Sequence, residues 1–154
     1  MWTTKFMIDG VWCGDVEETQ EIAAKRAKYA AGFRGRIIEP TSGRYHLYVS
    51  YACPFAHRVI LTHVLKRLDG IVGMSVVHPR WNTPDGWVFG ETPLSTPDGG
   101  GSGFTHLYQA YAASCRDYTG RVTVPLLWDS AARCIVSYQF EGIETLSLRR
   151  NARL

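Results

Sequence analysis

A short apolar segment that runs into a Cys-Pro pair and then into a helical repeat constrains this fold more than any other part of the sequence. Residues 45–50 carry the aromatic and β-branched side chains typical of a strand. Pro54 suits the first position of a helix, because its φ is already helical and its missing N–H leaves no bond unmade there. Apolar residues then recur at helical spacing until about Gly70, which suits a C-cap. We therefore predict a strand followed directly by a helix of about four turns.

A second buried apolar run lies at residues 71–77, which makes a strand–helix–strand unit. A crossover of this length joins parallel strands through a right-handed connection. The segments predicted beyond it are an irregular surface excursion, a helix, a proline-interrupted strand, a strand and a last helix, at residues 78–105, 104–111, 122–128, 134–137 and 140–150. The prediction is an α/β fold with a mixed sheet and the order β-α-β-α-β-β-α.

The first part of the chain differs from the rest. Residues 1–44 hold no long apolar pattern, and we predict that they form an N-terminal extension laid over the main domain at residues 45–150. Within the extension, residues 17–31 read as a polar, alanine-rich helix, and glycine and proline mark a linker after it. With 154 residues, the chain is long enough for one ordinary domain plus an extension and too short for two full domains.

The composition narrows the class of protein. Hydrophobic residues make up 45% of the chain and charged residues 20%, as in globular proteins that fold in water. No apolar run approaches the roughly 20 residues that span a bilayer, and the start lacks an apolar signal segment, so we expect a cytoplasmic protein without membrane contact. The net charge is +3, and the cluster at residues 25–28 is better explained by a solvated helix face than by contact with nucleic acid.

Cys53 is the candidate nucleophile. A thiol at the start of a helix faces unsatisfied amides and the positive end of the helix dipole, which favour its ionised form. Ala56 occupies the position where a dithiol motif has its second cysteine, so Cys53 can exchange only with a thiol from outside, most simply a small soluble one. The alternative is that Cys53 is a small buried apolar residue.

The remaining cysteines show no framework of their own. Cys13, Cys115 and Cys134 are widely spaced, which fits neither a zinc site nor a disulfide scaffold, and we predict that they are free structural thiols. His57 lies four positions after Cys53, but no third or fourth ligand follows at metal spacing. We therefore predict no metal site.

A thiol at the first strand-to-helix joint and a proline at the entry to the third strand are the arrangement of the thioredoxin-like fold, which this chain resembles. In that fold the proline peptide bond is cis and faces the cysteine, so the resemblance implies a cis bond between Val124 and Pro125. It also implies that the backbone of Val124 is free to pair with a bound peptide-like thiol. A trans Pro125 in an edge strand is the alternative.

A closer resemblance is carried by six segments in consistent order between residues 6 and 137, which read IDGVW (8–12), RYHLYVS (44–50), CPFAHR (53–58), SVVHP (75–79), GWVF (86–89) and YTGRVTVPLLWD (118–129). Together they resemble the xi-class glutathione transferases, the glutathionyl-hydroquinone reductases. The resemblance implies glutathione as cosubstrate and a quinone-type second substrate, and it leaves a homodimer open. By resemblance, Cys53 attacks the sulfur of a glutathionyl-hydroquinone, releases the hydroquinone and forms a mixed disulfide that a second glutathione resolves.

The same resemblance assigns the glutathione-binding residues. It implies that Trp87 packs on glutathione and that Arg121 supplies a cation for a carboxylate, in agreement with the planar fork in which guanidinium binds that group. Backbone groups for the cysteinyl amide come, by resemblance, from Val122, Thr123 and Val124. Structural alternatives stay open for two of these residues: Trp87 anchors its loop on the domain, and Arg121 is a surface charge at the start of a strand.

Two departures from the family bear on function. Family members continue the last strand into Asn-Glu-Ser, which holds the γ-glutamyl end, whereas this chain reads Tyr138-Gln139-Phe140, and a phenylalanine cannot replace a hydroxyl. They also continue into an all-helical domain that supplies the hydroquinone pocket, which we expect to be absent here. The prediction is a truncated thiol transferase with reduced or no turnover. The alternatives are a non-enzymatic remnant that self-associates through an exposed apolar face, and a thioredoxin-like binding or adaptor module.

Overall fold

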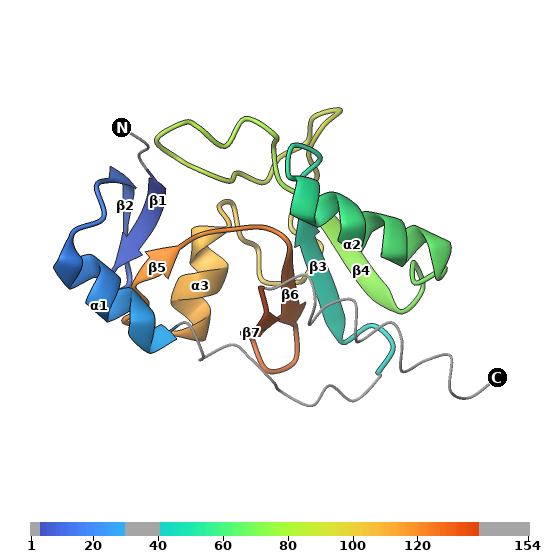
Figure 1. The fold of residues 1–154 in the computed structure, drawn as a ribbon. Helices are drawn as coiled ribbons and strands as arrows, with labels where there is room; N and C mark the ends of the chain where they lie inside the picture. Colours follow the sequence, from blue (N-terminus) through green and yellow to red (C-terminus); the bar gives the residue numbers. More distant parts are fainter. Residues whose placement is uncertain (1–3, 30–40, 139–154) are drawn as a thin grey trace.

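The polypeptide forms two sheets, which lie on either side of helix α3 in Figure 1. The computed structural model describes residues 4–29 and 41–138. The elements in chain order are β1 (Thr4–Ile8), β2 (Val11–Val16), α1 (Gln20–Tyr29), β3 (Tyr45–Val49), α2 (Pro54–Leu65), β4 (Val72–Val76), α3 (Tyr108–Ser114), β5 (Gly120–Arg121), β6 (Leu126–Asp129) and β7 (Cys134–Ser137). The smaller sheet has the strand order β2-β1-β5, and the larger sheet has the order β4-β3-β6-β7.

The larger sheet is the mixed sheet that the sequence predicts. β3 runs parallel to β4 and antiparallel to β6, and β7 pairs antiparallel with β6. Every residue of β3 is buried, because the strand has neighbours on both edges and is covered on both faces. Its polar member, His46, satisfies Nε2 against the Ser75 hydroxyl of β4 at 2.7 Å. The predicted parallel strand–helix–strand unit is confirmed.

Helix α2 begins at Pro54 as predicted but ends earlier than the prediction near Gly70. Arg67 adopts a left-handed conformation with φ of 50°. The amide of Arg67 donates to the carbonyl of Val64, and that of Leu68 donates to the carbonyl of His63, both at 3.0 Å. These two bonds are the Schellman pattern that closes a helix. The helix is therefore 12 residues long, with Lys66 as its C-cap. The left-handed residue after the cap is Arg67 rather than the glycine that the sequence suggests.

Helix α3 starts four residues later than the predicted helix at 104–111, because the residues before it pair with the long loop. The amide of Phe89 donates to the carbonyl of Thr105, and that of Leu107 donates to the carbonyl of Trp87, both at 2.9 Å. The predicted surface excursion at 78–105 is wrong in part for the same reason: Trp87 and Phe89 are buried in the core, at 8% and 7% exposure.

The predicted extension contains a β-hairpin that periodicity did not reveal. β1 and β2 pair antiparallel, and β1 also pairs with β5, so the hairpin belongs to the same sheet as a segment of the main domain. Gly10, with φ of 81°, makes the turn, and an added Cβ there would collide with the carbonyl of Arg116. The domain boundary at residue 44 stays a prediction.

The strand predicted at 122–128 is wrong in its extent. Gly120 and Arg121 pair with β1 in the smaller sheet, whereas Leu126–Asp129 pair with β3 in the larger one. Residues 122–125 cross between the two sheets and belong to neither. This crossing segment, residues 122–125, ends at the proline.

Helix α1 falls within the predicted range 17–31 and buries no residue. Lys25 lies 2.7 Å from Asp9 in the hairpin turn, and Arg26 lies 2.6 Å from Glu18. The helix is attached to the rest of the protein through the Lys25–Asp9 ion pair and through Tyr29, whose ring packs against that of Tyr118 and whose hydroxyl donates to the carbonyl of Asp117 at 2.9 Å. The predicted last helix at 140–150 lies outside the described residues.

Candidate active site

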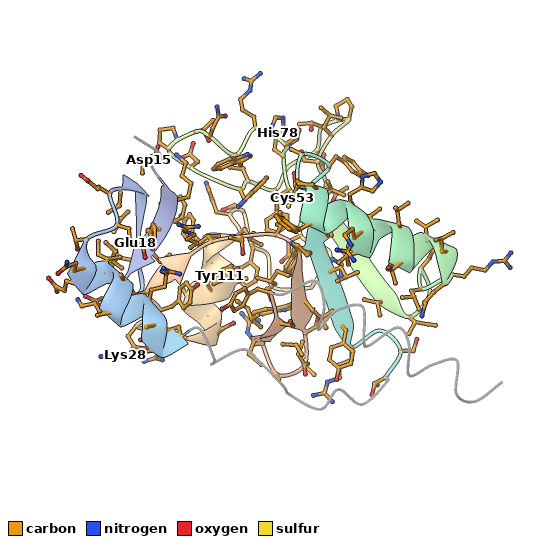
Figure 2. The ribbon with its side chains drawn as sticks, in the orientation of Figure 1. Asp15, Glu18, Lys28, Cys53, His78 and Tyr111 are labelled. Atoms are coloured by element: carbon orange, nitrogen blue, oxygen red, sulfur yellow. The ribbon has the colours of Figure 1, made fainter. Side chains whose placement is uncertain are left out.

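Cys53 lies at the joint between β3 and α2, with the extended backbone angles φ −101° and ψ 116° of a residue that precedes a helix. Figure 2 places it at the end of α2 nearest the centre of the molecule. Its side chain accepts no capping hydrogen bond from the first turn of the helix. The thiol instead donates to the carbonyl oxygen of Val124, with the sulfur 3.4 Å from that oxygen, and the residue is half-buried. Cys53 therefore meets the crossing segment directly.

The peptide bond between Val124 and Pro125 is cis, as the resemblance implies, so the trans alternative is wrong. Val124 is 5% exposed. Within the part of the chain that the structure describes, its amide N–H donates to no acceptor, while its carbonyl receives the Cys53 thiol. A buried amide without a partner is costly unless a ligand or water completes it. The backbone of Val124 thus offers one donor and one acceptor beside the sulfur.

The other two predicted backbone partners are already bonded within the protein. The amide of Val122 donates to the carbonyl of Lys5 in β1 at 3.3 Å. The amide of Thr123 donates to the Tyr111 hydroxyl at 3.2 Å, and its carbonyl accepts from the same hydroxyl at 3.0 Å. The amides of Val122 and Thr123 are therefore not available to a ligand. Of the three predicted backbone partners, only Val124 has an amide without an acceptor among the described residues.

Arg121 lies in β5, beside the hairpin. Its guanidinium sits over the ring of Phe6 at 5.9 Å and 3.6 Å from a carboxylate oxygen of Glu18. The side chain is 50% exposed. These contacts agree with the structural alternative for Arg121, and the exposed half leaves donors available to a further carboxylate.

Trp87 is a member of the core and anchors the loop of residues 78–105, in agreement with its structural alternative. Its ring stacks on that of Trp81, with the centroids 5.6 Å apart and the planes 26° apart. Trp81 is 41% exposed, whereas Trp87 is 8% exposed. Sequence reasoning did not single out Trp81, which presents the outer aromatic face of the pair.

His78 shares the edge of the sheet where Cys53 lies. The amide of Val77 donates to the carbonyl of Val49 at 2.8 Å, which brings the ends of β3 and β4 together. His78 follows at once, and Figure 2 shows it on the same side of the molecule as Cys53. Its Nδ1 accepts the amide N–H of Arg80 at 3.1 Å, so the neutral ring carries its proton on Nε2.

Two of the other cysteines have local hydrogen-bond partners. The thiol of Cys115 donates to a carboxylate oxygen of Asp117 at 3.1 Å, and burial together with this carboxylate raises the pKa of Cys115. The thiol of Cys13, an exposed residue of β2, donates to the carbonyl of Val11 at 3.4 Å. A raised pKa keeps Cys115 in its thiol form near neutral pH, so it is a poor nucleophile.

Tyr111 falls within the helix predicted at residues 104–111, and the contacts of its hydroxyl with Thr123 were not predicted. The available signal was the residue type, because a buried tyrosine usually finds a hydrogen-bond partner for its hydroxyl, whereas phenylalanine needs none. The described residues contain no group of three or more His, Cys, Asp or Glu side chains placed to hold a metal. No helix among these residues is long and apolar enough to cross a membrane.

No family model matches the chain. The chain is 40% identical over 145 residues to the glutathionyl-hydroquinone reductase PcpF of Sphingobium chlorophenolicum, a match that covers 89% of this chain and 44% of that protein. It is 38% identical over 149 residues to the glutathionyl-hydroquinone reductase YqjG of Escherichia coli K12, over 85% of this chain and 44% of that protein. The chain is homologous to one part of the xi-class glutathione transferases.

Solved structures of that class confirm the thioredoxin-like fold. The xi-class glutathione transferase from Natrialba magadii superposes with a TM-score of 0.79 at 36% identity, over 94% of this chain and 44% of that one. The glutathione-bound structure of YqjG, a glutathione transferase homologue from Escherichia coli K-12, superposes with a TM-score of 0.71 at 33% identity, over 92% of this chain and 44% of that one. The chain thus spans less than half the length of the relatives that it matches, which agrees with the predicted correspondence to their N-terminal domain.

Proposed function

We propose that this chain is the glutathione-binding, thiol-bearing part of a glutathione-dependent thiol transferase of the xi class. The observation that carries the proposal is the placement of the Cys53 sulfur 3.4 Å from the carbonyl of Val124, whose own amide has no acceptor among residues 4–29 and 41–138. This donor and acceptor can pair with the amide groups around the cysteine of glutathione, as an added strand pairs with a sheet edge. The pairing would bring the glutathione sulfur against Cys53.

In the proposed reaction, the Cys53 thiolate attacks the sulfur of a glutathionyl-hydroquinone. A sulfur–sulfur bond forms, the carbon–sulfur bond to the hydroquinone breaks, and the hydroquinone carbon takes the electron pair and a proton from solvent. A second glutathione thiolate then attacks the mixed disulfide, releases oxidised glutathione and restores the Cys53 thiolate. Because no second cysteine lies three positions after Cys53, the resolving thiol comes from solution.

Arg121 and Trp87 complete the proposed glutathione site. The exposed half of the Arg121 side chain would bind a carboxylate of glutathione, with Glu18 and Phe6 holding the guanidinium on its other side. The exposed ring of Trp81, stacked on the buried ring of Trp87, would cover one face of the tripeptide. Since the free thiol must stay reduced between turnovers, a reducing compartment such as the cytoplasm suits this chemistry.

The test is formation of one covalent adduct. Incubation with oxidised glutathione, followed by mass spectrometry of peptides, is expected to find glutathione on Cys53 alone. The Cys53→Ser variant serves as the control and should stay unmodified under the same conditions. Labelling of Cys13, Cys115 and Cys134 to the same extent as Cys53, or no labelling of Cys53, would contradict the proposal.

A second candidate function is a non-enzymatic chain that self-associates, as in a homodimer. The observation that favours it is an apolar strip on the outer face of α2, where Leu61, Val64 and Leu65 are 49%, 56% and 79% exposed. Light scattering over a range of protein concentrations tests this candidate. A monomer throughout, together with the Cys53 adduct, would exclude it.

A further inference from the structure

The hydroxyl of Tyr111 hydrogen-bonds to Thr123 of the crossing segment, one residue before Val124. It donates to the carbonyl oxygen of Thr123 at 3.0 Å and accepts the amide N–H of the same residue at 3.2 Å. It also lies 3.4 Å from the Thr123 side-chain oxygen. One hydroxyl therefore meets both backbone groups of a single residue.

The side chain of Tyr111 is held in place by core packing and by the contacts of its helix. Tyr111 is fully buried, and its ring packs against that of Tyr118 with the centroids 5.0 Å apart. Helix α3 is tied to β7 by Ser114, whose hydroxyl accepts the amide of Ile135 at 2.7 Å. Burial raises the pKa of Tyr111 to about 12, so the hydroxyl keeps its proton near neutral pH and can donate and accept at once.

Because a peptide unit is planar, the hydrogen bond at the Thr123 carbonyl also orients the amide of Val124. The carbonyl of Thr123 and the amide N–H of Val124 belong to one peptide unit, and in a trans unit these two groups point in opposite directions. A hydroxyl that fixes the direction of the carbonyl therefore also fixes the direction of the N–H, away from Tyr111. That N–H is the amide without an acceptor among the described residues.

Resting on the function proposed above, we propose that Tyr111 is a positioning residue for glutathione. Its hydroxyl orients the peptide unit between Thr123 and Val124, so that the Val124 amide points at the cysteinyl carbonyl of the bound tripeptide. Tyr111 does not touch glutathione in this arrangement. Its loss would weaken recognition of glutathione and leave the chemistry of the sulfur intact.

The experiment compares two disulfides on the same thiol. Rates of Cys53 modification are measured against the concentration of oxidised glutathione and, separately, of bis(2-hydroxyethyl) disulfide, which has no peptide groups. For Tyr111→Phe, we expect the half-saturating concentration of oxidised glutathione to rise about fivefold. The reason is that the Val124 amide is no longer aligned, so the tripeptide loses roughly one net hydrogen bond. The rate with the small disulfide should equal that of the wild type.

The matched control is Tyr48→Phe, which removes another buried tyrosine hydroxyl, one bonded to Asp98 rather than to the crossing segment. This variant should lose stability and keep the wild-type dependence on oxidised glutathione. An unchanged half-saturating concentration in Tyr111→Phe, or an equal loss with both disulfides, would overturn the positioning role. If the wild type itself shows no preference for oxidised glutathione over the small disulfide, the proposed function fails instead.

A measurement without any change at Tyr111 gives a second test. In the Cys53→Ser chain, addition of S-methylglutathione should shift the backbone amide resonance of Val124, while the amide of Thr123 keeps its shift and its protection from hydrogen exchange. A shift at Thr123 with none at Val124 would contradict the proposal.

Discussion

Replacing Asp98 by alanine should remove the group that holds the turn after it together. Its carboxylate accepts the hydroxyl of Tyr48 at 2.7 Å and three backbone amides, those of Gly100, Ser102 and Phe104, at 2.8, 3.2 and 3.0 Å. The turn is a close fit, because an added Cβ at Gly100 would collide with the Tyr48 hydroxyl. One side chain therefore links a central strand to the loop that precedes α3.

The magnitude follows from what would be left unpaired. Tyr48 is fully buried, so its hydroxyl would lose a charge-assisted bond without access to water, at a cost of about 2 kcal/mol. The turn amides reach water more easily and should add about 1 kcal/mol. A total of about 3 kcal/mol corresponds to a melting temperature lowered by roughly 9 °C for a chain of this size.

The assay is urea and thermal unfolding of Asp98→Ala, Tyr48→Phe and the double variant. Because the two single changes remove the same hydrogen bond, the double variant should cost about 2 kcal/mol less than their sum. Additive costs would refute the reasoning.

The dependence of the unfolding free energy on pH gives a second check. Burial opposes ionisation of Asp98, but hydrogen bonds from Phe104 and Tyr48 outweigh it and lower the pKa. The stabilisation is therefore present above the ordinary pKa of aspartate and lost as the pH falls through the lowered folded-state pKa, a loss that Asp98→Ala should not show.

Three further predictions concern the rest of the fold. Gly10→Ala should destabilise the chain by more than about 2 kcal/mol in urea unfolding, because a Cβ on its left-handed backbone meets a carbonyl, and a wild-type midpoint would contradict this. Arg44→Met should make the free energy of unfolding less sensitive to acid. The hydrogen bond from Arg44 lowers the pKa of Asp129, and the stability that this gives is lost as the pH falls through that lowered value. An unaltered dependence of unfolding on acid pH would count against this prediction. Leu65→Lys should reduce self-association in light scattering and leave the melting temperature within about 1 °C of the wild type, because the side chain is 79% exposed; unchanged association would remove α2 as the interface.

Local patterns in the sequence were enough to predict the centre of the larger sheet. The strand at 45–49, the start of α2 at Pro54 and the parallel strand at 72–76 depend on periodicity and on the backbone angles of single residues, which neighbours in sequence decide. The cis bond before Pro125 was predicted from the resemblance to a fold, and the structure agrees.

By itself, then, the amino-acid order determined a thiol at a strand-to-helix joint and the class of fold around it. Only the tertiary structure decided which groups at the site are open. Periodicity assigned residues 104–107 to a helix, but the carbonyl of Thr105 and the amide of Leu107 bond to the loop around Trp87. Tyr111 likewise takes the backbone groups of Thr123 that seemed available to a ligand. The physical reason is that a backbone hydrogen bond is satisfied by whichever partner the fold brings near, and a partner far away in the chain leaves no trace in the local pattern.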